Sequence, residues 1–344
     1  QQFLNRELGQ LEFNRRVLAQ AENKSIPLLE RLKYLCIVSS NLDEFFEIRV
    51  AGLKEQVKLG SLTASVDGMT ADQTLRLVRQ QAHDLIDQQY KLFNADILPA
   101  LAETGVKFLP RIQWNEAQQA WVKDFFFREV MPVLTPIGLD PSHPFPRVLN
   151  KSLNFAVELQ GKDAFGRNST RAIVQAPRVV PRTILMPSEV SGCEYGFVFL
   201  SSILHAHVDE LFTGMEVLGC YQFRVTRNSD LFVDEEEAKN LRITLQGELP
   251  QRHFGDAVRL EIADNCSPVI ADMLLKEFNL ASGDLYRVNG PVNLVRLMGI
   301  PDLVDREDLK FPVFVPSVPG VLQKKGADMF KVIRKSDILL HHPY

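Results

Sequence analysis

The feature that most constrains the fold is a change in the spacing of apolar residues near residue 105. On the amino-terminal side, apolar residues recur every three or four positions, which is the spacing of one face of a helix. They are Leu28, Leu32, Leu35, Leu75, Val78, Ala82, Leu85 and Ile86. A polar, glycine-containing segment at 60–70 separates two such stretches, and Pro99 with Gly105 is expected to end the last helix. Residues 1–105 are therefore predicted to form an all-helical bundle of about four antiparallel helices.

Beyond residue 105 the sequence predicts strands mixed with helices. A helix is expected at 114–130, with Trp121, Phe125 and Phe126 on its apolar face, and a proline-rich segment that cannot be regular helix follows it. Strand-like runs occur at 153–159, 172–176, 197–200, 221–226 and 258–262, and helical runs at 202–212, 235–245 and 267–278. Because strands and helices do not alternate strictly, residues 106–310 are predicted to form an α+β head domain whose sheet is covered on one face.

The last residues, 311–344, are predicted to be a linker and the start of a further domain. Prolines are frequent again after Phe311, and Met329, Phe330 and Ile333 mark a short amphipathic helix. The sequence opens on glutamine without a methionine and stops at Tyr344 within an apolar segment. We therefore expect a chain that has been truncated or cleaved.

Composition argues against several classes of protein. With 344 residues, 45% of them apolar and 24% charged, the chain is expected to be a soluble protein of more than one domain. The net charge is −4, and residues 1–105 carry 12 Lys+Arg against 14 Asp+Glu. A polyanion-binding surface must therefore be local or lie on sequence that is missing, and no nucleic acid partner is expected. The four cysteines are far apart, which indicates free thiols in the cytoplasm, and no apolar run is long enough to span a bilayer.

Motifs for catalysis or metal binding are scarce. The sequence has no GxxxxGKS/T, GxGxxG, GxSxG or HExxH motif. His205 and His207 would point to different faces of one helix, and three glutamates at 235–237 are expected to be a solvated helix start. His341 and His342 could suggest a phosphohistidine, but no neighbouring residue is suited to activate them. Residue types alone therefore identify no catalytic centre.

Three separated parts of the sequence resemble the polyphosphate kinase family, of the type that works through a phosphohistidine. The first covers 7–18, 21–35 and 39–50, and its most recognisable mark is Ser-Asn-Leu-Asp-Glu-Phe-Phe at 40–46. The second covers 140–146 and 150–154, and the third covers 337–344. One departure is Gly9-Gln10, where the family usually has Ser-Trp, so a packing aromatic is missing.

The resemblance implies which reaction such an enzyme catalyses and which of its domains carry the catalytic residues. The family transfers the terminal phosphoryl group of ATP to inorganic polyphosphate, reversibly, through a phosphorylated histidine and with Mg²⁺. A helical N-terminal domain and a head domain used in dimer contacts precede two C-terminal domains that resemble phospholipase D. The phosphorylated histidine, its partner histidine and the magnesium ligands belong to those last two domains. This chain is accordingly expected to lack the catalytic residues and the metal ligands, and to be inactive alone.

The resemblance also implies partners and a place in the cell. ATP or ADP and inorganic polyphosphate are the expected ligands, and a homodimer or a higher homo-oligomer is the expected assembly. The cytoplasm is the expected location, with the surface of the inner membrane as the alternative. Two other functions stay open from the sequence. One is a stand-alone, non-catalytic binding or dimerisation module of the same ancestry. The other is an unrelated nucleotide-dependent enzyme, against which the missing phosphate loops count.

Asn41 is the leading candidate for a contact with ATP. The resemblance implies that the asparagine of the 40–46 segment touches the nucleotide. The residues alone also predict that Asn41 begins a helix as its N-cap, with Glu44 three positions on as in a capping box. An amide side chain carries both a donor and an acceptor, so the two roles are compatible.

Tyr34 and Arg49 are weaker candidates for the same site. Tyr34 would offer an aromatic face to adenine and Arg49 a cation to phosphate. The alternatives are a half-buried core tyrosine and an arginine paired with Asp43 or Glu47. The adjacent phenylalanines at 45–46 are expected to point in different directions, so that at most one faces inward and the other can pack against the next domain.

Overall fold

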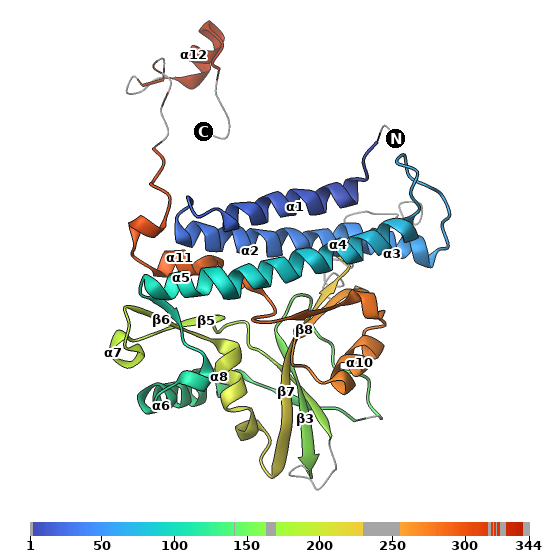
Figure 1. Cartoon of the computed structure of the whole chain (residues 1–344), viewed down its shortest axis with the longest axis vertical. Coiled ribbons are helices and arrows are strands. Elements are labelled where there is room, and N and C mark those ends of the chain that lie inside the picture. Colours follow the sequence, from blue (N-terminus) through green and yellow to red (C-terminus); the bar gives the residue numbers. More distant parts are fainter. Residues whose placement is uncertain are drawn as a thin grey trace.

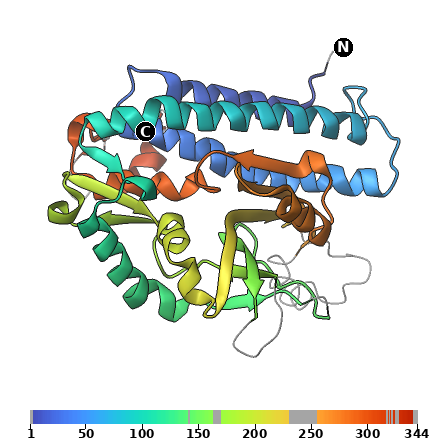
Figure 2. The same cartoon turned by 60° about the horizontal axis from the view of Figure 1, so that its bottom comes forward.

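The computed structural model describes residues 3–140, 142–162, 170–229, 255–315, 318, 320, 322–323 and 328–339. Within them, a layer of long helices lies along one side of a mixed α/β part that contains two sheets (Figures 1 and 2). A helical amino-terminal region followed by a mixed α/β region confirms the predicted fold class.

Three helical rods make up the layer. The first is α1 (Arg6–Glu22). The second joins α2 (Leu28–Glu44), the π-helical segment η1 (Phe45–Val50) and α3 (Ala51–Lys58) without a break. The third joins α4 (Ala71–Leu92), the π-helical segment η2 (Phe93–Ile97) and α5 (Leu98–Glu103) in the same way. The described residues 6–103 thus contain five α-helices joined into three rods, where the sequence predicted about four helices.

Pro99 does not end the last helix, contrary to the prediction. It lies in the first turn of α5, directly after η2. A proline lacks the amide hydrogen that a continuous α-helix needs, and the wider π-helical turn before it already displaces that hydrogen bond. Gly105, with a φ of +89°, follows the helix end and leads the chain into β1 (Val106–Phe108).

The polar segment at 60–70 joins the second and third rods, as the sequence predicts. α4 begins after Thr70, whose hydroxyl accepts a hydrogen bond from the amide of Gln73. The side chain of Gln73 accepts in return from the amide of Thr70. This reciprocal cap satisfies two amides that the first turn of a helix would leave unpaired.

The α/β part contains two sheets. The three-stranded sheet has the order β1–β6–β5, and the six-stranded sheet has the order β2–β4–β3–β7–β8–β9, antiparallel except between β8 and β9. The further strands are β2 (Pro136–Gly138), β3 (Asn154–Gly161), β4 (Arg171–Gln175), β5 (Thr183–Met186), β6 (Tyr195–Phe199), β7 (Met215–Arg227), β8 (Ala257–Ala263) and β9 (Leu285–Val288). The five predicted strands are present. The sequence missed β1, β2, β5 and β9 because runs of three or four residues carry little periodic signal.

The helices of this part are short. They are α6 (Glu116–Phe125) with its π-helical continuation η4 (Phe126–Val130), α7 (Ser188–Ser191), α8 (Leu200–Ala206), α10 (Pro268–Glu277) and α11 (Ile300–Leu303). Short 3₁₀ segments are η3 (Arg111–Gln113), η5 (Met131–Val133), η6 (Val208–Leu211), η8 (Ser282–Asp284), η9 (Leu294–Gly299) and η10 (Glu307–Leu309). The predicted helices at 114–130, 202–212 and 267–278 are confirmed, and α12 (Met329–Lys335) matches the predicted amphipathic helix. The helix predicted at 235–245 lies outside the described residues.

The six-stranded sheet is covered on both faces, whereas the sequence predicted cover on one. Phe155, Val157 and Leu159 of β3 join the apolar cluster that includes the long helices. Ala156, between them, joins a second cluster formed with α10, and Ile173 of β4 does the same. Alternate residues of a strand point to opposite faces, so both faces of this sheet are apolar and both need a covering layer.

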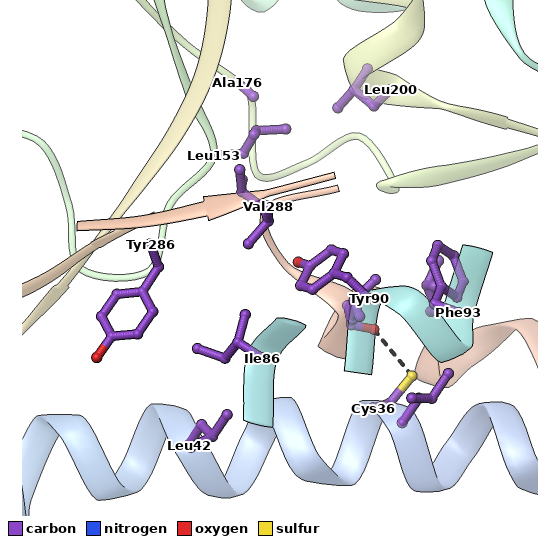
Figure 3. Packing of buried hydrophobic residues seen from close by; sticks show 14 of the residues in the cluster. Cys36, Leu42, Ile86, Tyr90, Phe93, Leu153, Ala176, Leu200, Tyr286 and Val288 are labelled. Carbon is purple, nitrogen blue, oxygen red and sulfur yellow. Dashed lines mark hydrogen bonds between the residues drawn. The ribbon is translucent and has the colours of Figure 1, made fainter. Parts of the chain in front are cut away.

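Side chains of the helical layer pack directly on the sheet (Figure 3). Leu42 of α2 and Ile86 of α4 lie beneath Tyr286 and Val288 of β9 in one continuous cluster. Cys36 also belongs to this cluster, and its thiol donates a hydrogen bond of 3.1 Å to the carbonyl of Leu294. Because this core crosses residue 105, the division into domains at 1–105, 106–310 and 311–344 stays a prediction. No helix among the described residues is both long enough and apolar enough to cross a membrane.

Thiol reactivity tests this packing. Cys193 is half-buried, whereas Cys36, Cys220 and Cys266 are buried. Burial raises the pKa of Cys220 to about 12 and that of Cys266 to about 11, and raises the pKa of Cys36 further still. Since the thiolate is the reactive form, Cys193 should be alkylated by iodoacetamide at neutral pH at least about tenfold faster than the other three.

Peptide mass spectrometry at several times after adding the reagent gives the four rates. In concentrated urea, where the chain is unfolded, the four thiols should react at similar rates. If Cys36 reacted as fast as Cys193 in the native chain, α2 would not be packed on the α/β part as described.

Candidate functional site

The 39–50 segment lies inside a continuous helix. The second rod begins at Leu28, so Asn41 is in the last turn of α2 and not at a helix start. The prediction that Asn41 is an N-cap with Glu44 in a capping box was therefore wrong. It failed because the π-helical segment η1 carries the helix on where the sequence suggested a new beginning.

Asn41 borders a small pocket between α1 and the second rod. The pocket has a volume of about 200 Å³ and is lined by Gln10, Asn41, Glu44, Phe45, Ile48 and Arg49. The Nδ2 atom of Asn41 donates a hydrogen bond of 2.9 Å to Oδ1 of Asn14, which is completely buried on α1. Within the described chain, Nδ2 of Asn14 has no hydrogen-bond partner. Since an amide NH₂ has two hydrogens, Asn41 keeps one hydrogen and its oxygen for a ligand.

Of the two weaker candidates, the structure brings only Arg49 to this pocket. Arg49 lines it, is exposed, and makes no ion pair with any described residue, so the predicted alternative of pairing with Asp43 or Glu47 was wrong. Tyr34 does not line the pocket. It is half-buried against the core, seven residues before Asn41 and so about 10 Å away along the helix axis. Its position matches the alternative of a core tyrosine.

Gln10 and Asn14 are site residues that the sequence reasoning did not select. Gln10 stands where the family usually has tryptophan, so the missing aromatic falls on the border of the pocket that holds Asn41. The departure from the family pattern at Gln10 was the available signal. No sequence signal identified Asn14, because its role depends on a contact between α1 and α2.

The opposite face of the 39–50 segment is locked to the sheet by a buried ionic cluster. The carboxylate of Asp43 contacts Nη1 of Arg224 on β7 at 2.8 Å and Nη2 of Arg259 on β8 at 2.5 Å. Glu261 on β8 contacts both of these arginines. The guanidinium of Arg259 also lies 4.4 Å above the ring of Phe46. Two cations and two carboxylates are thus buried together, and their charges balance.

The pKa values of the two carboxyl groups in this cluster shift in opposite directions. Burial by itself raises the pKa of Asp43, but the charges of Arg224 and Arg259 outweigh burial and hold that pKa below its usual value. Burial raises the pKa of Glu261, and the same two arginines only partly oppose this effect. Asp43 is therefore the carboxylate that this cluster favours in its charged form.

Both phenylalanines at 45–46 are buried, and Phe46 packs against the α/β part, as the sequence predicted for one of the two. Each exposes 2% of its surface, and their rings meet edge to face with centroids 5.8 Å apart. Phe46 also meets Tyr286 of β9 at 5.5 Å. An isolated helix would expose one of the two rings, but here the sheet and α1 enclose the rod from two sides.

Two further ionic contacts join the helical layer to the α/β part. Glu47 accepts hydrogen bonds from the side chains of Asn150, at 2.6 Å, and Lys151, at 2.7 Å. On α3 and α4, Lys54 and Arg79 each contact Asp284 at 2.9 Å. The segment at 150–154, which the resemblance marked separately from 39–50, therefore meets it in space.

A second, larger cavity of about 980 Å³ opens beside Glu47. It is lined by Glu47, Asn150, Lys151, Arg178, Val180, Pro181, Arg182, Thr183, Ser229, Arg296, Gly299 and Leu303. Four of these residues are cations and one is a carboxylate, in a chain whose net charge is −4. The sequence did not predict this cavity because its cations come from three separate segments, around 151, 178–182 and 296.

The histidines flagged in the sequence do not form a metal site with the described residues. His205 and His207 are half-buried, and burial lowers the pKa of each. His207 packs against the ring of Phe126. No group of three or more His, Cys, Asp or Glu side chains suited to a metal ion occurs in the part of the chain that the structure describes. His341 and His342 lie outside that part, as do the glutamates at 235–237.

Comparisons with known proteins bear on this arrangement. The chain matches the family models of the polyphosphate kinase N-terminal domain over residues 3–109 and of the polyphosphate kinase middle domain over residues 117–300. This chain belongs to the polyphosphate kinase family. The Asn41 pocket and the Asp43 cluster are therefore features of a polyphosphate kinase N-terminal and middle region.

Individual relatives support the same family assignment. Polyphosphate kinases of Neisseria meningitidis serogroup C and Burkholderia vietnamiensis are 59% and 56% identical to the chain, each over 341 residues. Each match covers 99% of this chain and 50% of the relative, so the chain spans about half the length of the curated relatives it matches. The crystal structure of the polyphosphate kinase from Porphyromonas gingivalis aligns with a TM-score of 0.79 at 26% identity, over 99% of this chain and 47% of that one.

Removing the charge of Asp43 tests the buried cluster. In an Asp43→Asn variant, two buried arginines would face one carboxylate, and breaking a buried pair costs about 3–5 kcal/mol. We expect the free energy of unfolding in urea to fall by about that amount. Asp72→Asn is the matched control, because Asp72 pairs with Arg76 on the exposed surface of α4, and it should change the stability little. Equal effects of the two substitutions would contradict the role given to Asp43.

Proposed function

We propose that this chain forms one wall of the ATP site in a polyphosphate kinase that transfers the terminal phosphoryl group of ATP, reversibly, to inorganic polyphosphate. The observation that carries the proposal is the position of Asn41. It borders a pocket with a free hydrogen-bond donor and acceptor, and the cation of Arg49 borders the same pocket. An amide can bind a nucleotide edge or a phosphate oxygen, and a guanidinium binds phosphate.

The course of the chain supports this assignment. After η10 the chain passes the start of α2, where the amide of Phe311 contacts Glu30. It then reaches α12 on the side of the helical layer that faces away from the sheets (Figure 1). The α1 side of the layer, which includes the pocket of Asn41, is therefore the side on which α12 lies.

The catalytic histidines and the magnesium ligands belong, in this proposal, to the half that the longer relatives have in addition. Among the described residues no set of side chains is suited to hold Mg²⁺. Magnesium, when bound in such an enzyme, neutralises charge on the transferring phosphate. The residues of this chain contribute binding and orientation: Asn41 fixes the nucleotide, and the ionic cluster around Asp43 fixes the helix that carries Asn41. The α/β part would supply contacts between the subunits of a homo-oligomer.

Replacing Asn41 by aspartate in the polyphosphate kinase that contains both halves tests the nucleotide contact. Aspartate keeps the size of the side chain but removes its donor and adds a negative charge near phosphate. The amide of Asn14 could rotate to donate to it, so α1 and α2 should stay together. We expect the KM for ATP to rise roughly tenfold.

The control for this experiment is Gln80→Glu on the exposed face of α4, which makes the same amide-to-carboxylate change away from the pockets described here. It should leave the KM for ATP as it is. An Asn41→Asp enzyme that kept the wild-type KM for ATP would refute the contact.

The isolated chain of 344 residues should not synthesise polyphosphate from ATP and Mg²⁺. Positioning alone cannot transfer a phosphoryl group when the nucleophile and the metal ligands are absent. The measurement is the conversion of radiolabelled ATP to acid-insoluble polyphosphate, with a polyphosphate kinase of the longer kind as the positive control. Clear turnover by the isolated chain would contradict this division of labour.

A further inference from the structure

The cavity of about 980 Å³ beside Glu47 gathers positive charge from three segments of the α/β part, and Glu47 of the helical layer borders it. Lys151 and Arg182 are half-buried, while Arg178 and Arg296 are exposed at the edge. The single carboxylate in its lining, Glu47, is already bonded to Lys151 and Asn150. The positive charge of the three arginines is therefore not cancelled by the lining.

The arginines of this cavity also repel one another. Burial lowers the pKa of Arg182 to about 10, and the charges of Arg296 and Arg178 add to this effect. None of the three forms an ion pair with a carboxylate of the described chain, although other arginines, such as Arg79 and Arg306, do. Like charges held together in this way are stabilised by an anion that binds between them.

The backbone holds one of the cations in an uncommon conformation. Lys151 has a φ of +55°, in the left-handed region that residues other than glycine seldom occupy. Its amide donates a hydrogen bond of 2.8 Å to the carbonyl of Val225, and Asn150 donates to Glu47. These contacts keep the side chain of Lys151 at the cavity wall.

The lining also limits the kind of anion. None of the residues that line the cavity is aromatic, so a nucleotide base would have no ring on which to stack. A chain of phosphates carries charge along its whole length and presents oxygens that arginine forks can bind in pairs. The size of the cavity is in the upper range for ligand sites.

We propose that this cavity, between the second helical rod and the three-stranded sheet, binds a stretch of inorganic polyphosphate through Lys151, Arg178, Arg182 and Arg296. The proposal rests on the proposed function, since it assigns a binding site to the polymer that the enzyme would extend. It is separate in space from the pocket of Asn41, whose lining shares no residue with it.

The test measures binding of end-labelled polyphosphate to the purified 344-residue chain by fluorescence anisotropy. The variant is Arg178→Gln with Arg296→Gln, two exposed positions at which the loss of a side chain should not prevent folding. We expect its Kd for polyphosphate to rise roughly tenfold. We also expect a smaller dependence of affinity on salt concentration, because two phosphate contacts are lost.

The matched control is Arg76→Gln with Arg128→Gln, which removes the same charge from exposed positions on α4 and η4. Its Kd should remain within about twofold of the wild type, as expected for arginines outside the site. Equal weakening in both double variants, or no weakening in either, would overturn the proposal. Displacement of the label by ATP or by a DNA oligonucleotide as readily as by unlabelled polyphosphate would also overturn it.

The Asn41→Asp substitution separates this proposal from the proposed function. In the 344-residue chain it should leave the Kd for polyphosphate unchanged, because Asn41 does not line the basic cavity. Loss of polyphosphate binding in that variant would mean that ATP and polyphosphate share one site. It would refute a separate polyphosphate site in the basic cavity. An unchanged KM for ATP in the longer enzyme would refute the nucleotide contact and leave the basic cavity standing.

Discussion

The arrangement of this chain depends on one buried carboxylate. Asp43 leaves water only because Arg224 and Arg259 reach it from two neighbouring strands of the sheet. A charge buried without such partners is very unfavourable, so the second helical rod has one favourable position and rotation on the sheet. Apolar packing of Leu42, Phe45 and Phe46 would hold the layers together in several registers, whereas the ionic contacts select one of them.

The ionic contacts that set the rotation of the second rod also set the direction in which its opposite face points. Asp43 and Glu47 are one helical turn apart and face the sheet, while Asn41 and Arg49 border the pocket beside α1. A rotation that relaxed the ionic contacts would move Asn41 away from Asn14. The segment that marks the family thus serves two purposes with one helix. It joins the helical layer to the α/β part, and it presents polar groups on the other side.

The balance of charge differs between the buried ionic cluster and the cavity beside Glu47. The chain is acidic overall, and its buried ionic cluster is balanced, with two arginines against Asp43 and Glu261. The cavity beside Glu47 is different because its arginines find no carboxylate among the described residues. A cleft lined by an excess of one sign of charge raises the local concentration of oppositely charged ions, so this cavity favours anions even though the chain as a whole is acidic.

The sequence by itself determined the class of fold, the family and most of the longer elements, because helical and strand spacing are local properties and the 40–46 segment is distinctive. It missed β1, β2, β5 and β9, and it misread Asn41 as a helix start. Short strands form only beside their partners, and η1 continues a helix that local chemistry would stop. Only the tertiary structure decided that Asp43 meets Arg224 and Arg259 across about 200 residues of sequence. Only it decided that four cations from three distant segments share one cavity. The physical reason is that ionic and amide contacts between layers depend on how helices and strands are placed in space, which the spacing of residues along the chain does not encode.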